Sequence, residues 1–289
     1  MGPRSSPHGE VIVTLRCPDR VGIVRAVAGF LADRDVNILE SQQFADPSTD
    51  QFFMRVQAGL PNGLAVGALR EEFSELAARF EMAAAVHDAR VRPRVVILVS
   101  RLGHCLNDLL YRQRVGALVA DFVAVVSNHP DFEDLARSYG VPFVHLPVSP
   151  QTKAAQEERL RSLVDELGAD LVLLARYMQI LSPPTVEHLE GRAINIHHSF
   201  LPSFKGARPY QQAYDRGVKL IGATAHYVTS ELDEGPIIEQ EVARVDHNQT
   251  PDELAAVGRD IECVALARAA RWHLEHRVML NGKKTVVFP

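Results

Sequence analysis

Hydrophobic and polar positions follow two different patterns along the chain, and the change comes near residue 94. In the first part, residues 11–15 alternate like a half-buried strand, and residues 23–33 place apolar side chains at helical spacing. Two further strands are predicted over 36–44 and 51–57, then a helix over 64–80 and a last strand over 81–87. The order strand, helix, strand, strand, helix, strand predicts a ferredoxin-like βαββαβ domain.

Beyond residue 94, short and continuously apolar runs alternate with helical stretches. The runs are of the kind expected for strands buried on both faces, and they cover residues 95–99, 122–126, 143–146, 171–174 and 193–196. The clearest helical stretch covers residues 152–168. This alternation predicts a Rossmann-like, mostly parallel sheet with helices on both sides, so the fold class is α/β.

The two patterns predict how the chain divides into domains. We expect a tail over residues 1–9, the βαββαβ domain over 10–90, a linker over 91–94 and the second domain over 95–289.

Composition changes this picture mainly by exclusion. The chain has 36 acidic and 31 basic side chains, a net charge of −5, whereas nucleic-acid binding usually needs a basic face. Its apolar runs fall short of the roughly 20 residues that span a bilayer, and the first nine residues lack the apolar stretch of a signal peptide. Three widely spaced cysteines, Cys17, Cys105 and Cys263, suit a reducing compartment. We therefore expect a cytoplasmic protein with no nucleic-acid or membrane partner.

The densest polar cluster follows the predicted strand over 193–196. Asn195 and His197 are two residues apart, so on a strand their side chains face the same pocket. A second polar cluster follows an alternating strand over 221–228, where an acidic loop can bring Asp233 over that pocket. The sequence therefore predicts an amide, an imidazole and a carboxylate in one site.

These three groups suit attack on an acyl carbon. Asn195 can donate a hydrogen bond to the developing oxyanion. His197 can donate to the same oxygen or move a proton to the leaving nitrogen, and Asp233 can orient the nucleophile and accept its proton. Zinc is a competing interpretation, because His197, His198, His226 and Asp233 are all ligand types. Their spacing matches no zinc motif, so we expect no metal.

The residues of this site resemble a known family. Asn195-Ile196-His197, Leu201-Pro202 and Leu232-Asp233-Glu234-Gly235-Pro236 resemble the signature of the folate-dependent formyltransferases, and the resemblance covers about residues 94–280. It implies that Asn195, His197 and Asp233 are catalytic and that His226 supports the aspartate. The segment 175–181 resembles the part of the family that lines the pterin pocket. The implied folate-binding residues are Met178, Ile180, Leu181, Val228 and Leu232, although such apolar residues are also typical of an ordinary core.

The amino-terminal unit resembles an ACT domain, a small-ligand regulatory module, in its segment Pro18-Asp19-Arg20-Val21-Gly22. The resemblance implies a homo-oligomer and an amino-acid effector near Asp19 and Gly22. The alternative is a dimerisation domain that binds no ligand.

Two features indicate which reaction of the family is used. Residues 100–107 contain a single glycine where the ribonucleotide transformylases have a Gly/Ser-rich phosphate loop, which disfavours a phosphorylated acceptor. An ACT-like unit ahead of this domain, together with His197-His198-Ser199, resembles the 10-formyltetrahydrofolate hydrolases, also called formyltetrahydrofolate deformylases. The resemblance implies that water attacks the formyl carbon of 10-formyltetrahydrofolate, without a tightly bound cofactor, to give tetrahydrofolate and formate.

Two alternatives stay open at this point. One is transfer of the formyl group from the folate to an amine such as glycinamide ribonucleotide. The other is a folate or amino-acid sensor without catalytic activity. The role of His198 also stays open, because on a strand it faces away from His197.

Overall fold

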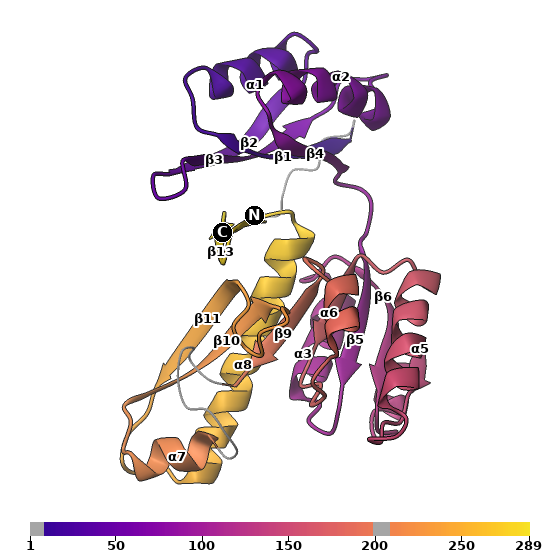
Figure 1. Cartoon of the computed structure of the whole chain (residues 1–289), viewed down its shortest axis with the longest axis vertical. Coiled ribbons are helices and arrows are strands. Elements are labelled where there is room, and N and C mark those ends of the chain that lie inside the picture. The colour runs from indigo at the N-terminus through magenta and orange to yellow at the C-terminus, as the bar shows by residue number, and fades with distance from the viewer. Residues whose placement is uncertain (1–8, 199–208) are drawn as a thin grey trace. The chain divides into compact units, whose positions relative to one another are not determined.

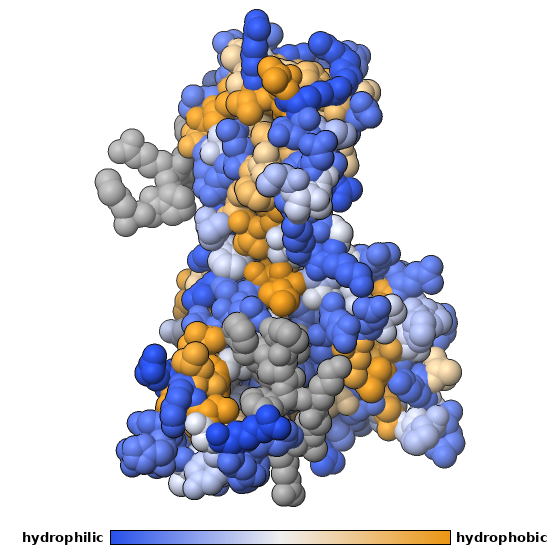
Figure 2. All heavy atoms as spheres, turned by 60° about the vertical axis from the view of Figure 1, so that its left-hand side comes forward, coloured by the Kyte–Doolittle hydropathy of each residue, from blue (hydrophilic) through white to orange (hydrophobic). Residues whose placement is uncertain are grey.

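The computed structural model describes residues 9–198 and 209–289. Within it the chain forms two compact units, and Figure 1 shows their elements. Leu201 and Pro202 of the family signature lie outside the described residues. In the described part of the chain, no helix is both long and apolar enough to cross a membrane. Figure 2 shows apolar surface gathered in small patches on a face that is otherwise mostly hydrophilic.

The first unit is the predicted βαββαβ domain. Its elements are β1 (Glu10–Pro18), α1 (Ile23–Ala32), β2 (Asn37–Asp46), β3 (Gln51–Gly59), α2 (Val66–Arg79) and β4 (Ala83–Asp88). The strands form an antiparallel sheet in the order β2-β3-β1-β4. The core lies between this sheet and the two helices, where Val27, Leu31 and Phe73 pack against alternate residues of β1 and β3. The predicted order of elements is confirmed.

The other face of this sheet is covered by the end of the chain. A two-stranded sheet of β12 (Val278–Asn281) and β13 (Lys284–Val287) brings Val286 and Phe288 against Phe53 of β3. Beside them Arg55 is buried, pairs with Glu40 at 3.0 Å and donates to the Glu275 carbonyl at 3.1 Å. The sequence analysis assigned all of 95–289 to the second domain, whereas Glu275–Asn281 and Thr285–Pro289 make their contacts in the first unit. The reason is that Phe53 and Arg55 lie on the second face of β3 and are buried, so this face needs a cover as well.

The second unit alternates strands and helices as predicted. Its elements are β5 (Arg94–Val99), α3 (His104–Arg114), β6 (Asp121–Ser127), α4 (Glu133–Ser138), β7 (Phe143–His145), α5 (Lys153–Glu166), β8 (Leu171–Leu174), α6 (Pro183–His188), β9 (Ala193–His197), α7 (Pro209–Asp215), β10 (Leu220–Tyr227), β11 (Ile237–Arg244) and α8 (Pro251–Leu274). The sheet order is β11-β10-β9-β8-β5-β6-β7. The five strands from β9 to β7 are parallel, and β10 is antiparallel to both of its neighbours, so the sheet is mostly parallel.

The topology places the chemistry at one edge of this sheet. From β5 the chain proceeds to β6 and β7 on one side and then returns to β8 and β9 on the other. Ligands of open parallel sheets bind outside the carboxyl ends of the strands, near such a reversal. The residues that follow β5, β8 and β9 therefore meet at this edge, and α8 packs against β9, β10 and α3 beside it.

Candidate active site

Strand β9 presents Asn195 and His197 on one face, as the alternation of the sequence predicts. Ile194 and Ile196 point the other way and are buried, so the packing of these isoleucines sets which face the polar pair occupies. The neighbouring strand β10 is antiparallel and pairs His226 directly with Asn195. An amide and two imidazoles are thus positioned by paired strands rather than by loops.

Asp233 lies on the turn after β10 and completes the group. Its Oδ2 is 3.1 Å from Nδ1 of His197, and its Oδ1 is 3.5 Å from Nδ2 of Asn195. The backbone at Asp233 is left-handed, with φ of 58°, a conformation that aspartate tolerates better than most residues. The three catalytic residues predicted from the sequence therefore converge in the structure.

Gly235 is what allows this turn to pack so closely. A Cβ atom at this position would lie 1.7 Å from the carbonyl oxygen of Tyr227 and 3.1 Å from Nδ1 of His226. Only glycine leaves room for the backbone of the turn against the end of β10.

His226 lies beside Asn195 and Asp233, and the hydrogen bond of its Nδ1 defines which ring nitrogen faces them. Its Nδ1 donates to the carbonyl oxygen of Tyr227 at 2.9 Å, so Nε2 faces the site. Nε2 is 3.4 Å from Nδ2 of Asn195 and 3.8 Å from Oδ1 of Asp233. The His226 ring is almost fully buried, so it is held in place behind the amide of Asn195 and the carboxylate of Asp233.

The surroundings of Asp233 keep it ionised. Burial alone would raise the pKa of its carboxyl, but hydrogen bonds from His197 and His226 and their charges outweigh burial and hold the pKa well below its usual range. The carboxylate is thus a permanent negative charge that orients His197. The contacts of Asn195 at 3.4 and 3.5 Å are long, which leaves its amide free to turn toward a developing oxyanion.

The apolar residues assigned to folate binding fall into two groups. The exposed fractions of Met178, Ile180 and Leu232 are 58, 62 and 61%, as expected for apolar side chains that contact a ligand when it is bound. Leu181, by contrast, is buried in the core of the second unit, and Val228 is partly buried against the same core. We therefore treat Leu181 as a packing residue.

Ser100 holds the segment that carries Met178, and sequence reasoning missed it. The Ser100 amide donates to the carbonyl of Arg176 at 3.2 Å, and the Met178 amide donates to the Ser100 hydroxyl at 3.0 Å. The hydroxyl in turn donates to Asn128 at 2.7 Å. The position directly after a buried strand was the only signal in the sequence that could have indicated this role.

A second polar cluster, in which Glu262 is buried and the other side chains are partly buried, lies beside His197, and no pattern in the sequence indicates it. Its members come from the ends of β8 and β9 and from three helices, and they are His104, Arg176, His198, Tyr210 and Glu262. Glu262 lies on the buried face of α8, which places it inside the unit.

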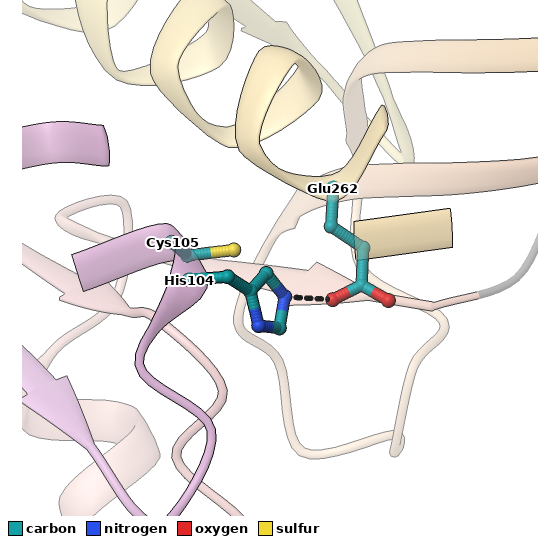
Figure 3. A group of neighbouring side chains, drawn as sticks. All are labelled: His104, Cys105 and Glu262. Atoms are coloured by element: carbon teal, nitrogen blue, oxygen red, sulfur yellow. Dashed lines mark hydrogen bonds and ion pairs between the residues drawn. The ribbon is translucent and has the colours of Figure 1, made fainter. Parts of the chain in front are cut away.

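Part of this cluster has the composition of a metal site. His104, Cys105 and Glu262 offer ligand atoms that lie within 4.8 Å of one another (Figure 3). However, His104 Nε2 and Glu262 Oε2 are already in hydrogen-bond contact at 2.7 Å, and Arg176 Nε is 3.5 Å from the same oxygen. A hydrogen bond with Cys263 and burial also raise the pKa of the Cys105 thiol well above its usual range, which keeps it protonated. These contacts form an ion-paired network. That the reaction uses no metal stays a prediction.

The two residues assigned to an effector site lie at the start of α1. The Asp19 amide donates to the carbonyl of Asp50 at 3.0 Å. Gly22 has φ of 100°, which requires glycine, but a Cβ there would meet no described atom within 4 Å. Gly22 also lines a hollow of about 560 Å³ between α1 and α2, together with Arg25, Phe30 and Arg79. An effector at this place stays a prediction.

Comparison with known proteins defines the class of protein first. The family described as formyl transferase matches residues 93–270, and the ACT domain family matches residues 11–73. The chain therefore carries a formyl transferase domain that contains the site, preceded by an ACT domain.

Full-length relatives define the family more narrowly. The chain is 52% identical to the formyltetrahydrofolate deformylase of Corynebacterium sp. (strain P-1), over 96% of this chain and 97% of that protein. It also resembles the crystal structure of the formyltetrahydrofolate deformylase of Burkholderia mallei ATCC 23344, with a TM-score of 0.94, 53% identity and coverage of 97 and 100%. The glycinamide ribonucleotide transformylase 1 of Symbiobacterium toebii is more distant, with a TM-score of 0.64, 31% identity and coverage of 68 and 95%. The chain belongs to the formyltetrahydrofolate deformylase family.

Proposed function

We propose that this protein hydrolyses 10-formyltetrahydrofolate to tetrahydrofolate and formate through Asn195, His197 and Asp233. The observation that supports these roles best is the contact of 3.1 Å between the ionised Asp233 and His197, with the amide of Asn195 alongside. Membership in the deformylase family supports the reaction, and the geometry supports the roles.

In the first step, a water molecule held between Asp233 and His197 attacks the formyl carbon on N10. The new C–O bond converts the carbonyl oxygen into an oxyanion, which accepts hydrogen bonds from Asn195 and His197. Asp233 deprotonates the water as it attacks. Because its pKa is so low, the carboxylate is a weak base, and the proton must move on to His197 rather than rest on Asp233.

In the second step, the tetrahedral intermediate collapses. The C–N bond breaks, N10 takes up a proton from His197, and formic acid leaves and ionises. The net reaction consumes one water and gives tetrahydrofolate, formate and one proton. The exposed side chains of Met178, Ile180 and Leu232 form the apolar wall that binds the pterin ring, with Val228 behind them.

The ACT domain leads to two further proposals. The ACT domain makes a homo-oligomer and an amino-acid effector near Asp19 and Gly22 reasonable, and we propose both. We further propose that the enzyme works in the cytoplasm without a tightly bound cofactor.

The test is to incubate the purified protein with 10-formyltetrahydrofolate in the absence of any amine and to quantify formate and tetrahydrofolate together. Release of both in equal amounts supports a hydrolase. Asn195→Ala is expected to lower kcat by roughly 10²- to 10³-fold, as loss of an oxyanion donor does. Product that forms only after glycinamide ribonucleotide is added would instead make the protein a transferase. Near-normal turnover in Asn195→Ala would refute the role of that residue.

A further inference from the structure

His198 lies against the catalytic histidine in a way that the reaction itself does not explain. The rings of His197 and His198 are stacked, with centroids 4.9 Å apart and planes 24° from parallel. A neighbour this close limits how the His197 ring can rotate and therefore which atom it presents to Asp233.

Arg176 sets the state of His198. Its Nη1 is 2.8 Å from Nδ1 of His198, and because a guanidinium can only donate, Nδ1 must be the acceptor. His198 therefore carries its proton on Nε2. Burial first, and then the charges of Arg176 and His197, lower the pKa of His198 to about 4, so the ring is neutral at physiological pH. A neutral neighbour does not repel a proton on His197.

Glu262 in turn forms an ion pair with Arg176. Glu262 is buried, with 1% of the residue exposed, and its Oε2 is 3.5 Å from Nε of Arg176 and 2.7 Å from Nε2 of His104. Its Oε1 accepts the Tyr210 hydroxyl at 2.9 Å. Burial raises the pKa of this carboxyl, but the contacts with His104 and Arg176 outweigh burial and keep it below its usual value. The result is a buried negative charge that balances the buried guanidinium.

We propose that Arg176 and Glu262 are positioning residues of this enzyme, which act on His197 through His198. Arg176 holds the His198 ring against His197, and Glu262 compensates the positive charge of Arg176 so that His197 can carry the proton of the reaction. The inference rests on the role of His197 in the proposed function.

Within residues 9–198 and 209–289, the charged and titratable groups near His197 come from several elements. They are Asp233 after β10, His226 on β10, His198 at the end of β9, Arg176 after β8, and Glu262 on α8 with its partners His104 and Tyr210. Of these, Glu262 is the one negative charge besides Asp233, so its removal changes the charge balance without touching the catalytic residues.

The first experiment compares the pH dependence of kcat for formate release in the wild type and Glu262→Gln. Loss of the carboxylate leaves the charge of Arg176 unbalanced, which disfavours a protonated His197. Because His197 receives the proton of the attacking water, it must start unprotonated, so we expect the acidic limb of kcat to move to lower pH by about one unit. Glu262→Asp keeps the charge and should restore the limb. The matched control is Glu253→Gln on the same helix, which is exposed and should leave the profile unchanged.

The second experiment uses Arg176→Lys and does not depend on the folding of Glu262→Gln. Lysine keeps the charge but cannot bind His198 and Glu262 with one planar group. We expect kcat to fall about tenfold, with an unchanged KM and an unmoved acidic limb.

Two results would overturn the inference. One is a lowered melting temperature in Glu262→Gln and Arg176→Lys with a wild-type kcat and pH profile, because the cluster would then be structural only. The other is stoichiometric zinc in the purified wild type that is lost in Glu262→Gln. If the wild type forms product only with an amine, the proposed function is wrong instead, and the same pH comparison is made on that transfer reaction.

Discussion

Gly235 offers a strict test of the geometry of the site, because it is not itself a catalytic residue. In Gly235→Ala the new Cβ would start 1.7 Å from the carbonyl oxygen of Tyr227, whereas contacts below 3.0 Å are essentially never seen. The turn must therefore move away from β10 by about 1.3 Å, which is the difference between these two distances. Asp233 lies two residues away on this turn, so it moves as well, and its distance of 3.1 Å to His197 is lost.

A misplacement of about 1 Å at a reacting group typically costs about 100-fold in rate. We therefore expect kcat for formate release from 10-formyltetrahydrofolate to fall by about 100-fold, or about 2.7 kcal/mol in the activation barrier. Circular dichroism and the melting temperature should show a folded protein, because the change is confined to one turn.

The matched control is Gly67→Ala. Gly67 lies in α2, where a Cβ would meet no described atom within 4 Å, so this variant should keep full activity and gain a little stability. Activity of Gly235→Ala within twofold of the wild type would refute the argument that this close approach positions Asp233.

Three further predictions address the charge of the site and the stability of each unit. Because the pKa of Asp233 is depressed in the folded state, its stabilising contribution is fully present above the ordinary carboxyl pKa and is lost as the pH falls toward the depressed pKa. The melting temperature of Asp233→Asn should therefore lie below that of the wild type at pH 5, and the gap should begin to narrow below about pH 4 and shrink further on acidification. A gap that grows on acidification would contradict this sign. Buried Glu157 accepts hydrogen bonds from the Ser182 amide at 2.9 Å and the Thr185 hydroxyl at 2.6 Å. Glu157→Gln should therefore lower the free energy of unfolding, measured in urea, by about 1–3 kcal/mol. An unchanged free energy would show that the glutamine side chain replaces these hydrogen bonds. Phe288→Ala should cost about 3 kcal/mol in the same assay, because Phe288 covers Phe53 on the open face of the first sheet, and an unchanged midpoint would mean that the C-terminal segment adds no stability.

The order of elements and the shared face of Asn195 and His197 could be predicted because both depend on local pattern. Alternation over two residues decides that Asn195 and His197 share a face, whatever the rest of the chain does. The continuous apolar runs of β5, β8 and β9 indicate a parallel sheet, and the position of polar residues at the strand ends then indicates the site. The family signature linked Asp233 to Asn195 across 38 positions, which periodicity alone could not do.

The tertiary structure decided everything that depends on contacts between distant segments. Glu262 is one example: it contacts Tyr210, which is 52 positions away, and His104, which is 158 positions away. It also pairs with Arg176, which follows a different element of the unit. No local pattern in the sequence encodes these contacts. The return of Phe288 to β3 is of the same kind. Local sequence determines the conformation of a segment and the face on which a side chain lies, whereas the neighbours of a buried charge follow only from how the segments pack.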